Sequence, residues 1–291
     1  PLERPPCSMQ GGRSNGMPSD SEMHKSERQN SAQIEIVLHG YSFFPKELSL
    51  EAYRYIWNER AQVFHAYGIT ILVTAIGTTI GVMMTLLYAY VLAHEKFPGK
   101  TFLAFYLFFT MLFNGGLVPT YIMYTRYLHM KNTIPALIIP GLLMSAFNVI
   151  LTRTYIQSNV PAALSEAAKI DGATEFQVFR KVVLPMCKPI IATVGLFAGL
   201  GYWNDWTNGL YYITDTNKFS IQQLLNNMIK NIEFLSKNAN SNINLASVGG
   251  GIPQETVRMA IAIVGLLPIL IVFPFVQKYF VKGISIGAVK G

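Results

Sequence analysis

Few residues in this chain have the types and spacing of a nucleotide-binding, metal-binding or disulfide site. Gly99-Lys100-Thr101 matches the end of a phosphate-binding loop, but such a loop needs another glycine five residues before Gly99, where His94 stands. The five histidines are scattered without metal-ligand spacing. The two cysteines, Cys7 and Cys187, support neither a disulfide framework nor a metal site. Cys187 lies among apolar residues and is expected to be buried. The sequence therefore predicts no nucleotide site, no metal and no cofactor.

The most informative stretch is residues 159–185, NVPAALSEAAKIDGATEFQVFRKVVLP. Pro161 suits the first turn of a helix, and the alanines, leucine and glutamate after it favour helix. Gly172, which follows Asp171, is expected to end this helix with a positive φ. The pattern predicts a short helix closed by a tight turn.

A second short helix is expected directly after that turn. Thr174 can cap it, and Gln177 three residues later completes a capping box. Phe176, Phe179 and Val183 would give this helix an apolar face. Leu184-Pro185 then turns the chain. Periodicity alone equally allows an ordinary helix–turn–helix loop with a solvated face.

The composition indicates where these elements lie. Of 291 residues, 51% are hydrophobic and 13% are charged, and the mean hydropathy is +0.31. Soluble domains are about 25% charged, and disordered chains and coiled coils need still more charge. With these classes excluded, the composition indicates a membrane protein. The net charge of +7 comes without basic clusters alternating with aromatic residues, so we expect basic span ends and no nucleic-acid partner.

Long runs without charge predict the membrane-spanning segments. A bilayer core needs about 20 apolar residues in a helix. The uncharged runs are 66–93, 101–125, 132–152, 189–204 and 259–277, which gives five expected spans. Gly77-x-x-x-Gly81 and Gly195-x-x-x-Gly199 fall inside spans and would allow close helix packing, although such pairs often occur by chance.

An odd number of spans places the two ends of the chain on opposite sides. Loops 94–100 and 153–188 and the end 278–291 share one side, which holds more Lys and Arg and is therefore expected to be cytoplasmic. Residues 1–32 contain no apolar segment. Either a first span is missing or this segment is not natural, and we expect the chain as written to assemble poorly, which a cysteine-labelling topology map tests.

Residues 159–185 also resemble a known motif. Glu166-Ala167-Ala168, then Gly172, Val182 and Leu184-Pro185 have the order and spacing of the EAA loop of ATP-binding-cassette (ABC) importer permeases, with Val182 in place of the usual isoleucine. Further stretches are similar to the maltose-type second permease subunit and its oligosaccharide relatives. They are FPKELSLEAYRYI at 44–56, FPGK at 97–100, NGGLVPTYI at 114–122, GYWNDW at 201–206 and the tail from 274 to 291.

The resemblance implies an all-α, polytopic transmembrane bundle with the type I ABC importer permease fold, normally of six spans. Residues 1–32 lie outside the resemblance and are expected to be an atypical, disordered polar segment. The span pattern and the resemblance together give an extracytoplasmic segment 33–65 before the first visible span, a permease domain 66–280 containing the cytoplasmic loop 153–188, and a cytoplasmic tail 281–291. The resemblance also implies a bacterial cell-membrane subunit that is not itself an enzyme. Expected partners are a cytoplasmic ABC ATPase dimer that hydrolyses the ATP, a second permease subunit, an extracytoplasmic solute-binding protein, membrane lipid and a sugar or oligosaccharide.

The resemblance assigns the first helix of the loop to ATPase docking. The residues concerned are Glu166, Ala167, Ala168, Asp171, Gly172, Leu184 and Pro185. The alanines would let the helix seat in a groove, Glu166 would face a polar partner, and Gly172 would permit the turn. A bulky side chain at either alanine is expected to clash with that groove.

Candidates for the solute path are aromatic and amide side chains, because sugars present CH faces and hydroxyls. They are Asn114, Tyr202, Trp203, Asn204 and Trp206. An interfacial aromatic belt explains the last four equally well, and a helix-to-helix hydrogen bond explains Asn114. A membrane enzyme is disfavoured, since the uncharged runs contain no Asp, Glu, Lys, Arg or His that could act in catalysis. A structural or assembly subunit without a solute path remains the alternative, which only the EAA loop opposes.

Overall fold

The computed structural model describes residues 57, 59–94, 97–239, 258–271 and 274. All secondary structure in these ranges is helical. Among the described residues, those up to Lys230 and those from Arg258 belong to one compact unit, which includes the helix α13 (Ile221–Ala239) as far as Lys230. The expected segment 1–32, most of 33–65 and the tail 281–291 lie outside the described residues.

A long helix, α3 (Arg60–Ala93), organises the compact unit and confirms the expected span 66–93. Its buried positions recur every three or four residues, at Ala66, Thr70, Val73, Gly77 and Gly81, which places them on one face. The other positions are largely apolar too and remain exposed. A helix that is apolar on all sides suits a membrane, where lipid covers what the bundle does not.

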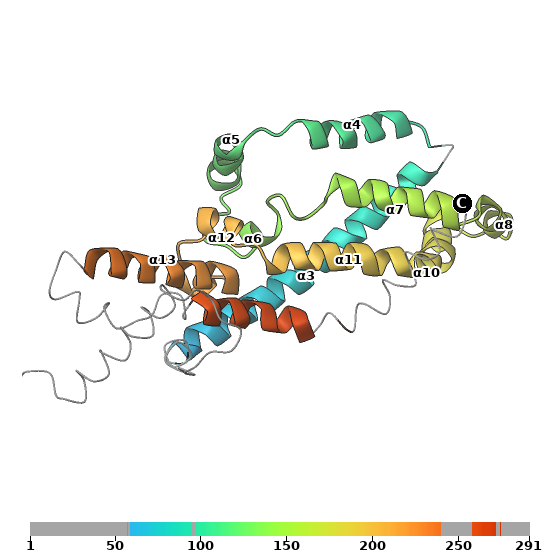
Figure 1. The fold of residues 1–291 in the computed structure, drawn as a ribbon. Helices are drawn as coiled ribbons and strands as arrows, with labels where there is room; N and C mark the ends of the chain where they lie inside the picture. Colours follow the sequence, from blue (N-terminus) through green and yellow to red (C-terminus); the bar gives the residue numbers. More distant parts are fainter. Residues whose placement is uncertain (1–56, 58, 95–96, 240–257, 272–273, 275–291) are drawn as a thin grey trace, which may run out of the picture. The chain divides into compact units, whose positions relative to one another are not determined.

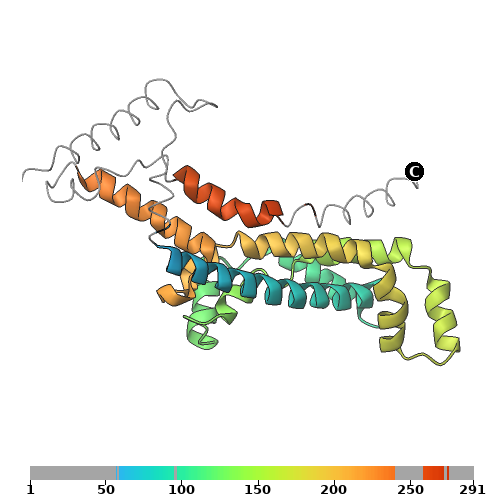
Figure 2. The ribbon, with the colours of Figure 1, turned by 90° about the horizontal axis from the view of Figure 1, so that it is seen from below.

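Two further helices pack against α3, namely α7 (Ala146–Asn159) and α11 (Lys188–Trp203), as Figures 1 and 2 show. α11 coincides with the expected span 189–204, but with 16 residues it is shorter than a complete span. A cluster of buried apolar side chains joins these helices and includes Leu86, Val149 and Val194. Cys187 is fully buried in this cluster, as its apolar surroundings predict.

Glycines on α3 permit the close approach of its neighbours. A Cβ at Gly77 would lie 2.4 Å from the ring of Tyr202 on α11, and one at Gly81 would lie 2.7 Å from the backbone oxygen of Leu143. The Gly77/Gly81 pair therefore packs as the sequence predicts. At Gly195 and Gly199 a Cβ would meet neighbours only at 3.9 and 3.6 Å, so that pair is not required for contact.

The expected span over 101–125 is not one continuous helix. α4 (Lys100–Leu112) ends before Asn114, and the helical segment Leu117–Tyr127, formed by α5 (Leu117–Ile122) and the π-helix η1 (Met123–Tyr127), is turned from it by 113°. The Asn114 side-chain oxygen accepts a hydrogen bond from the Gly116 N–H at 2.9 Å, and Gly116 has a φ of +81°. This local turn breaks the helix although no charge interrupts the apolar run.

The expected span over 132–152 is interrupted as well. It contains the short helix α6 (Pro135–Ile138), a non-helical stretch around Pro140 and Gly141, and only then the start of α7. Gly141 has a φ of +72°, which helix excludes.

The described residues therefore contain fewer straight spans than the apolar runs suggest. Only α3 among them is long and apolar enough to cross a membrane by itself, and up to three spans result if each of two bent helix pairs counts as one. The described part of the expected span 259–277 is the apolar helix Arg258–Ile271.

The loops divide between the two ends of α3 as the span parity predicts. At the end near Ala93, His94 lies 3.1 Å from Lys169. At the opposite end, His65 contacts the backbone oxygen of Asn217 at 2.7 Å. We call these the inner and the outer end. In Figure 1, α8 (Ala162–Ile170) and α10 (Leu184–Met186) gather at the inner end, and α6 and α12 (Thr207–Tyr212) at the outer end.

At the outer end Asn132 joins two loops. Its φ is +58°, in the left-handed region. Its side-chain oxygen accepts hydrogen bonds from the N–H groups of Thr214 at 2.6 Å and Asp215 at 3.2 Å, and its amide nitrogen donates to the Thr214 hydroxyl at 2.8 Å. Its own N–H donates to the Tyr212 oxygen at 2.9 Å, and the Lys218 ammonium donates to its carbonyl oxygen at 2.8 Å. One residue thus fixes the loop before α6 to the segment after α12.

Candidate functional site

The first helix of the loop is α8 (Ala162–Ile170), which begins directly after Pro161. At its other end Gly172 has the expected positive φ, +84°. The Gly172 N–H donates to the Lys169 oxygen at 3.0 Å, and the Ala173 N–H donates to the Ala168 oxygen at 2.9 Å. These hydrogen bonds form a complete Schellman motif, so the predicted turn is confirmed.

The second helix, α9 (Glu175–Val178), starts with the predicted capping box. The Thr174 N–H donates to the Gln177 side chain at 2.9 Å, and the Gln177 N–H donates to the Thr174 hydroxyl at 3.4 Å. The chain continues through the π-helix η2 (Phe179–Val183) into α10 (Leu184–Met186).

The expected apolar face of this second helix is wrong at Phe176, which is 65% exposed. Phe179 and Val183 are buried as expected, and Val178 is buried with them. Hydrogen bonds in a π-helix join residues five apart, so Val178 and Val183 share a face, and Phe176 is turned away.

One face of α8 packs against the chain, and the opposite face is exposed. Ala168 is partly buried and packs with Ala173 against the chain's own core. Ala163, Glu166, Ala167 and Ile170 lie three or four residues apart on the opposite face and are exposed. Ile170 is 86% exposed. We call these four residues the outward face. A bulky side chain at Ala168 would therefore clash with other parts of this chain. Of the two alanines, only Ala167 would contact a groove on another protein.

The last two predicted coupling residues shape the return to the bundle. Leu184 packs against the core cluster and Pro185 is exposed. Between them and α11 the chain bends by 81°, measured between Glu175–Met186 and Lys188–Trp203. The loop therefore stands at a steep angle to the helix that follows it.

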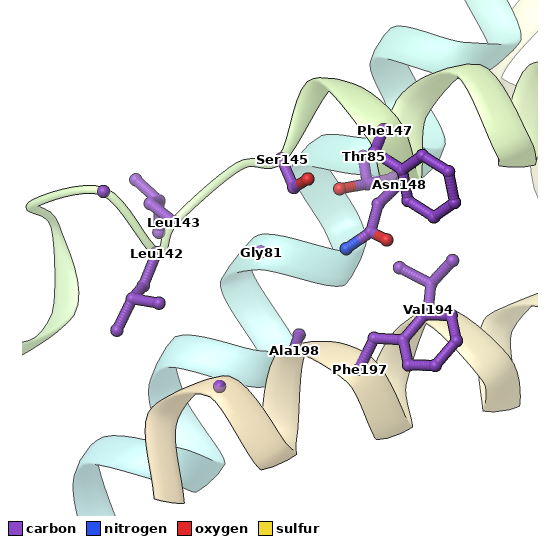
Figure 3. A pocket seen from close by; sticks show the side chains of 12 residues that line it. Gly81, Thr85, Leu142, Leu143, Ser145, Phe147, Asn148, Val194, Phe197 and Ala198 are labelled. Atoms are coloured by element: carbon purple, nitrogen blue, oxygen red, sulfur yellow. The ribbon is translucent and has the colours of Figure 1, made fainter. Parts of the chain in front are cut away.

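A pocket of 440 Å³ lies between α3, α7, α11 and the stretch before α7 (Figure 3). Its lining residues are Gly81, Thr85, Gly141, Leu142, Leu143, Ser145, Phe147, Asn148, Val194, Phe197, Ala198 and Gly201. Figure 3 shows the Asn148 amide, the Phe147 ring and the Phe197 ring around this space. The Asn148 amide and the Ser145 hydroxyl make no side-chain hydrogen bond with another described residue. The pocket therefore combines aromatic faces with available polar groups.

Sequence reasoning missed this pocket. Ser145 and Asn148 are polar residues inside an otherwise apolar run, which is the same signal that singles out Asn114. That signal could have identified Asn148, but not the rings beside it, because Phe147 and Phe197 come from different helices.

The structure separates the predicted solute-path residues from one another. Asn114 lies at the break after α4. Tyr202 is buried, and its hydroxyl donates to the Ile138 oxygen at 2.9 Å. The Trp203 indole N–H donates to the Gly265 oxygen at 3.2 Å. Helix packing thus accounts for the contacts of Tyr202 and Trp203.

Asn204 and Trp206 do come together, in a second pocket of 360 Å³ near the outer end. Gln222, Asn226 and Arg258 also line it. This pocket is rich in amide groups, in contrast with the first.

Asp205 lies between Asn204 and Trp206 in the sequence, but its side chain binds backbone N–H groups. Its carboxylate accepts hydrogen bonds from the N–H groups of Thr207 and Asn208, both at 3.1 Å, at the start of α12. Burial raises the pKa of this carboxyl despite those hydrogen bonds. Asp205 therefore shapes the turn from α11 to α12.

An apolar helical bundle, a loop with a protruding helix and a pocket between three helices are the features expected of a transporter's membrane subunit. The chain belongs to the family of binding-protein-dependent transport system inner membrane components, whose pattern matches residues 77–286. This membership confirms the predicted permease class and its location in the cell membrane.

Individual relatives match nearly the whole chain. It is 36% identical over 257 residues to the polygalacturonan/rhamnogalacturonan transport system permease protein YtcP of Bacillus subtilis (strain 168), covering 88% of this chain and 87% of that one. It is 28% identical over 250 residues to the melibiose/raffinose/stachyose import permease protein MelC of the same organism, covering 85% and 83%. It also resembles a chain of a bacterial ABC transporter involved in the import of the acidic polysaccharide alginate. That comparison gives a TM-score of 0.70 and 28% identity, covering 89% of this chain and 91% of that chain.

Proposed function

We propose that this chain forms part of the translocation path of an ABC importer for a sugar or oligosaccharide. The observation that carries the proposal is the pocket of 440 Å³, which lies in the bundle of a chain whose relatives are named for saccharide transport. A second permease subunit completes the path, and an extracytoplasmic binding protein delivers the solute. A purely structural subunit would have no use for such a pocket.

The energy comes from a separate ATPase that docks on the loop. The outward face of α8 supports this assignment. Its two alanines, its isoleucine and Glu166 are exposed, so they are available to a partner protein. Glu166 and Ala167 make the contact. Ala168, Asp171, Gly172, Leu184 and Pro185 act by holding α8 and its turn in position.

The pocket suits a saccharide. Sugar rings stack their CH faces on aromatic rings such as those of Phe147 and Phe197, and their hydroxyls pair with amides and hydroxyls such as those of Asn148 and Ser145. Asn204 and Trp206 offer the same chemistry in the outer pocket. Tyr202 and Trp203 support the path by packing.

Purification and transport assays test the function as a whole. A tag on this chain should recover an ABC ATPase and a second permease from membranes. The recovered complex with its binding protein, reconstituted in liposomes, should import at least one of trigalacturonate, raffinose and melibiose when ATP is supplied. Recovery of this chain without an ATPase would contradict the proposal and favour the assembly-subunit alternative.

Replacing Asn148 by alanine should weaken solute binding in the pocket. The loss of one hydrogen bond corresponds to about a 2- to 10-fold rise in the apparent KM for uptake, with the amount of assembled complex unchanged. Thr154→Ala, on an exposed position of the same helix, is the matched control and should leave the KM as it is. An unchanged KM for every imported saccharide in the Asn148 variant would assign this amide to helix packing.

A further inference from the structure

Four polar side chains connect the loop to the inner end of α3. The Lys169 ammonium on α8 lies 2.6 Å from the Glu175 carboxylate on α9 and 3.1 Å from the His94 Nε2. The Tyr90 hydroxyl on α3 donates to the same carboxylate at 2.9 Å, and His94 lies 3.7 Å from it. We call Tyr90, His94, Lys169 and Glu175 the clamp. It joins α8, α9 and α3 at one carboxylate.

The Glu175 carboxyl of the clamp is held in its ionised form. The hydrogen bond from Lys169 and the positive charge of that lysine hold the pKa of the Glu175 carboxyl below its usual value of 4.5. As the pH falls through this lowered pKa the carboxylate is protonated and its contribution is lost, so the acid limit of the interaction lies below the neutral range.

Aromatic packing fixes the α3 side of the clamp. The Tyr90 ring lies 5.2 Å from the Phe179 ring and 5.2 Å from the His94 ring, both measured between centroids. Phe179 is itself buried in the core cluster. The hydroxyl of Tyr90 is therefore presented to Glu175 from a supported position.

Little else sets the angle of α8 against the bundle. No residue of α8 is fully buried, and the helix reaches the core through the partly buried Ala168. The turn at Gly172 defines the path of the backbone, but a short helix can still tilt about such a turn. Exposed ion pairs contribute little stability, so the consequence of this clamp is orientation rather than folding.

The same helix that holds the clamp also lines the pocket. Thr85 and Gly81 face the pocket from α3, and Thr85 lies about 8 Å along the helix axis from Tyr90. A helix transmits displacement along its axis, because its backbone hydrogen bonds resist stretching. The clamp thus lies between the loop and a wall of the pocket.

We propose that the clamp positions the loop and transmits its movement to α3, which makes Tyr90, Lys169 and Glu175 positioning residues for transport. The proposal rests on the proposed function, since it takes the loop as the ATPase-docking element. It predicts that a broken clamp uncouples the pocket from ATP while the ATPase remains bound.

A labelling assay measures this coupling without knowledge of the solute. Ser145→Cys places a reporter in the pocket, Cys7→Ser removes one native thiol, and Cys187 is buried. In the reconstituted complex, ATP should change the rate at which a maleimide labels the reporter. Lys169→Glu should reduce that change at least about 5-fold, the lower range of allosteric coupling, with ATPase association and hydrolysis retained. Tyr90→Phe should reduce it less, because the ring packing remains.

Reversal of both charges supplies the decisive control. Lys169→Glu with Glu175→Lys restores the pair and should restore most of the response to ATP. Lys181→Glu reverses an exposed charge on η2 and should have no effect. A normal response in Lys169→Glu, no rescue by the double variant, or an equal loss in Lys181→Glu would each overturn the clamp. If the wild-type complex itself shows no response to ATP, the proposed function fails instead.

Discussion

Gly77→Ala is expected to destabilise the bundle more than any surface substitution. The new methyl group would lie 2.4 to 2.7 Å from ring carbons of Tyr202. This ring cannot move aside easily, because it is buried and its hydroxyl is bonded to the Ile138 oxygen. Overpacking of this kind costs about 1–3 kcal/mol. The measurements are the midpoint of thermal unfolding in detergent and the yield of monodisperse protein, and both should fall.

Gly68→Ala is the matched control on the same helix. A Cβ at Gly68 meets no atom within 4 Å, and alanine is the better helix former. This variant should be at least as stable as the parent chain. Equal stability of both variants would mean that α3 and α11 do not pack as closely as the structure shows.

Ala167→Trp is expected to abolish ATPase association. Ala167 is exposed on the outward face, so the large ring has room within this chain and should leave its fold intact. In a complex it would stand where a groove must fit a methyl group. We expect co-purification of the ATPase and ATP-driven uptake to fall at least about 10-fold, which corresponds to about 1.4 kcal/mol of binding free energy.

Two neighbouring substitutions separate docking from folding. Ala167→Ser stays small and should retain the ATPase. Ala168→Trp should instead lower the yield of folded chain, because Ala168 packs inward against Ala173. If Ala167→Trp left ATPase binding and uptake intact, α8 would not be the docking helix.

The parts of the fold that follow from local signals could be predicted from the sequence. α3 and α11 coincide with uncharged apolar runs, and the turn at Gly172 and the capping box at Thr174 follow from residues a few positions apart. Backbone hydrogen bonds within a few residues decide these features, so the sequence contains the necessary information.

The broken segments could not be predicted by counting apolar residues. Hydropathy treats Asn114 and the glycines after it as part of one span, although an Asn-Gly pair is also a turn signal. Which of the two signals prevails depends on the surrounding packing. The same holds for the pocket, since the rings of Phe147 and Phe197 meet only after α7 and α11 have packed against α3.

Asn132 illustrates how two unrelated demands, on the backbone and on the side chain, can restrict one position to very few amino acids. The left-handed backbone tolerates glycine, asparagine and aspartate far better than other residues. Glycine would leave the N–H groups of Thr214 and Asp215 without their acceptor, and aspartate would lose the donor to the Thr214 hydroxyl. Asparagine suits the left-handed backbone and supplies both an acceptor for these N–H groups and a donor for the hydroxyl, so natural variation at this position should be narrower than its partly exposed location suggests.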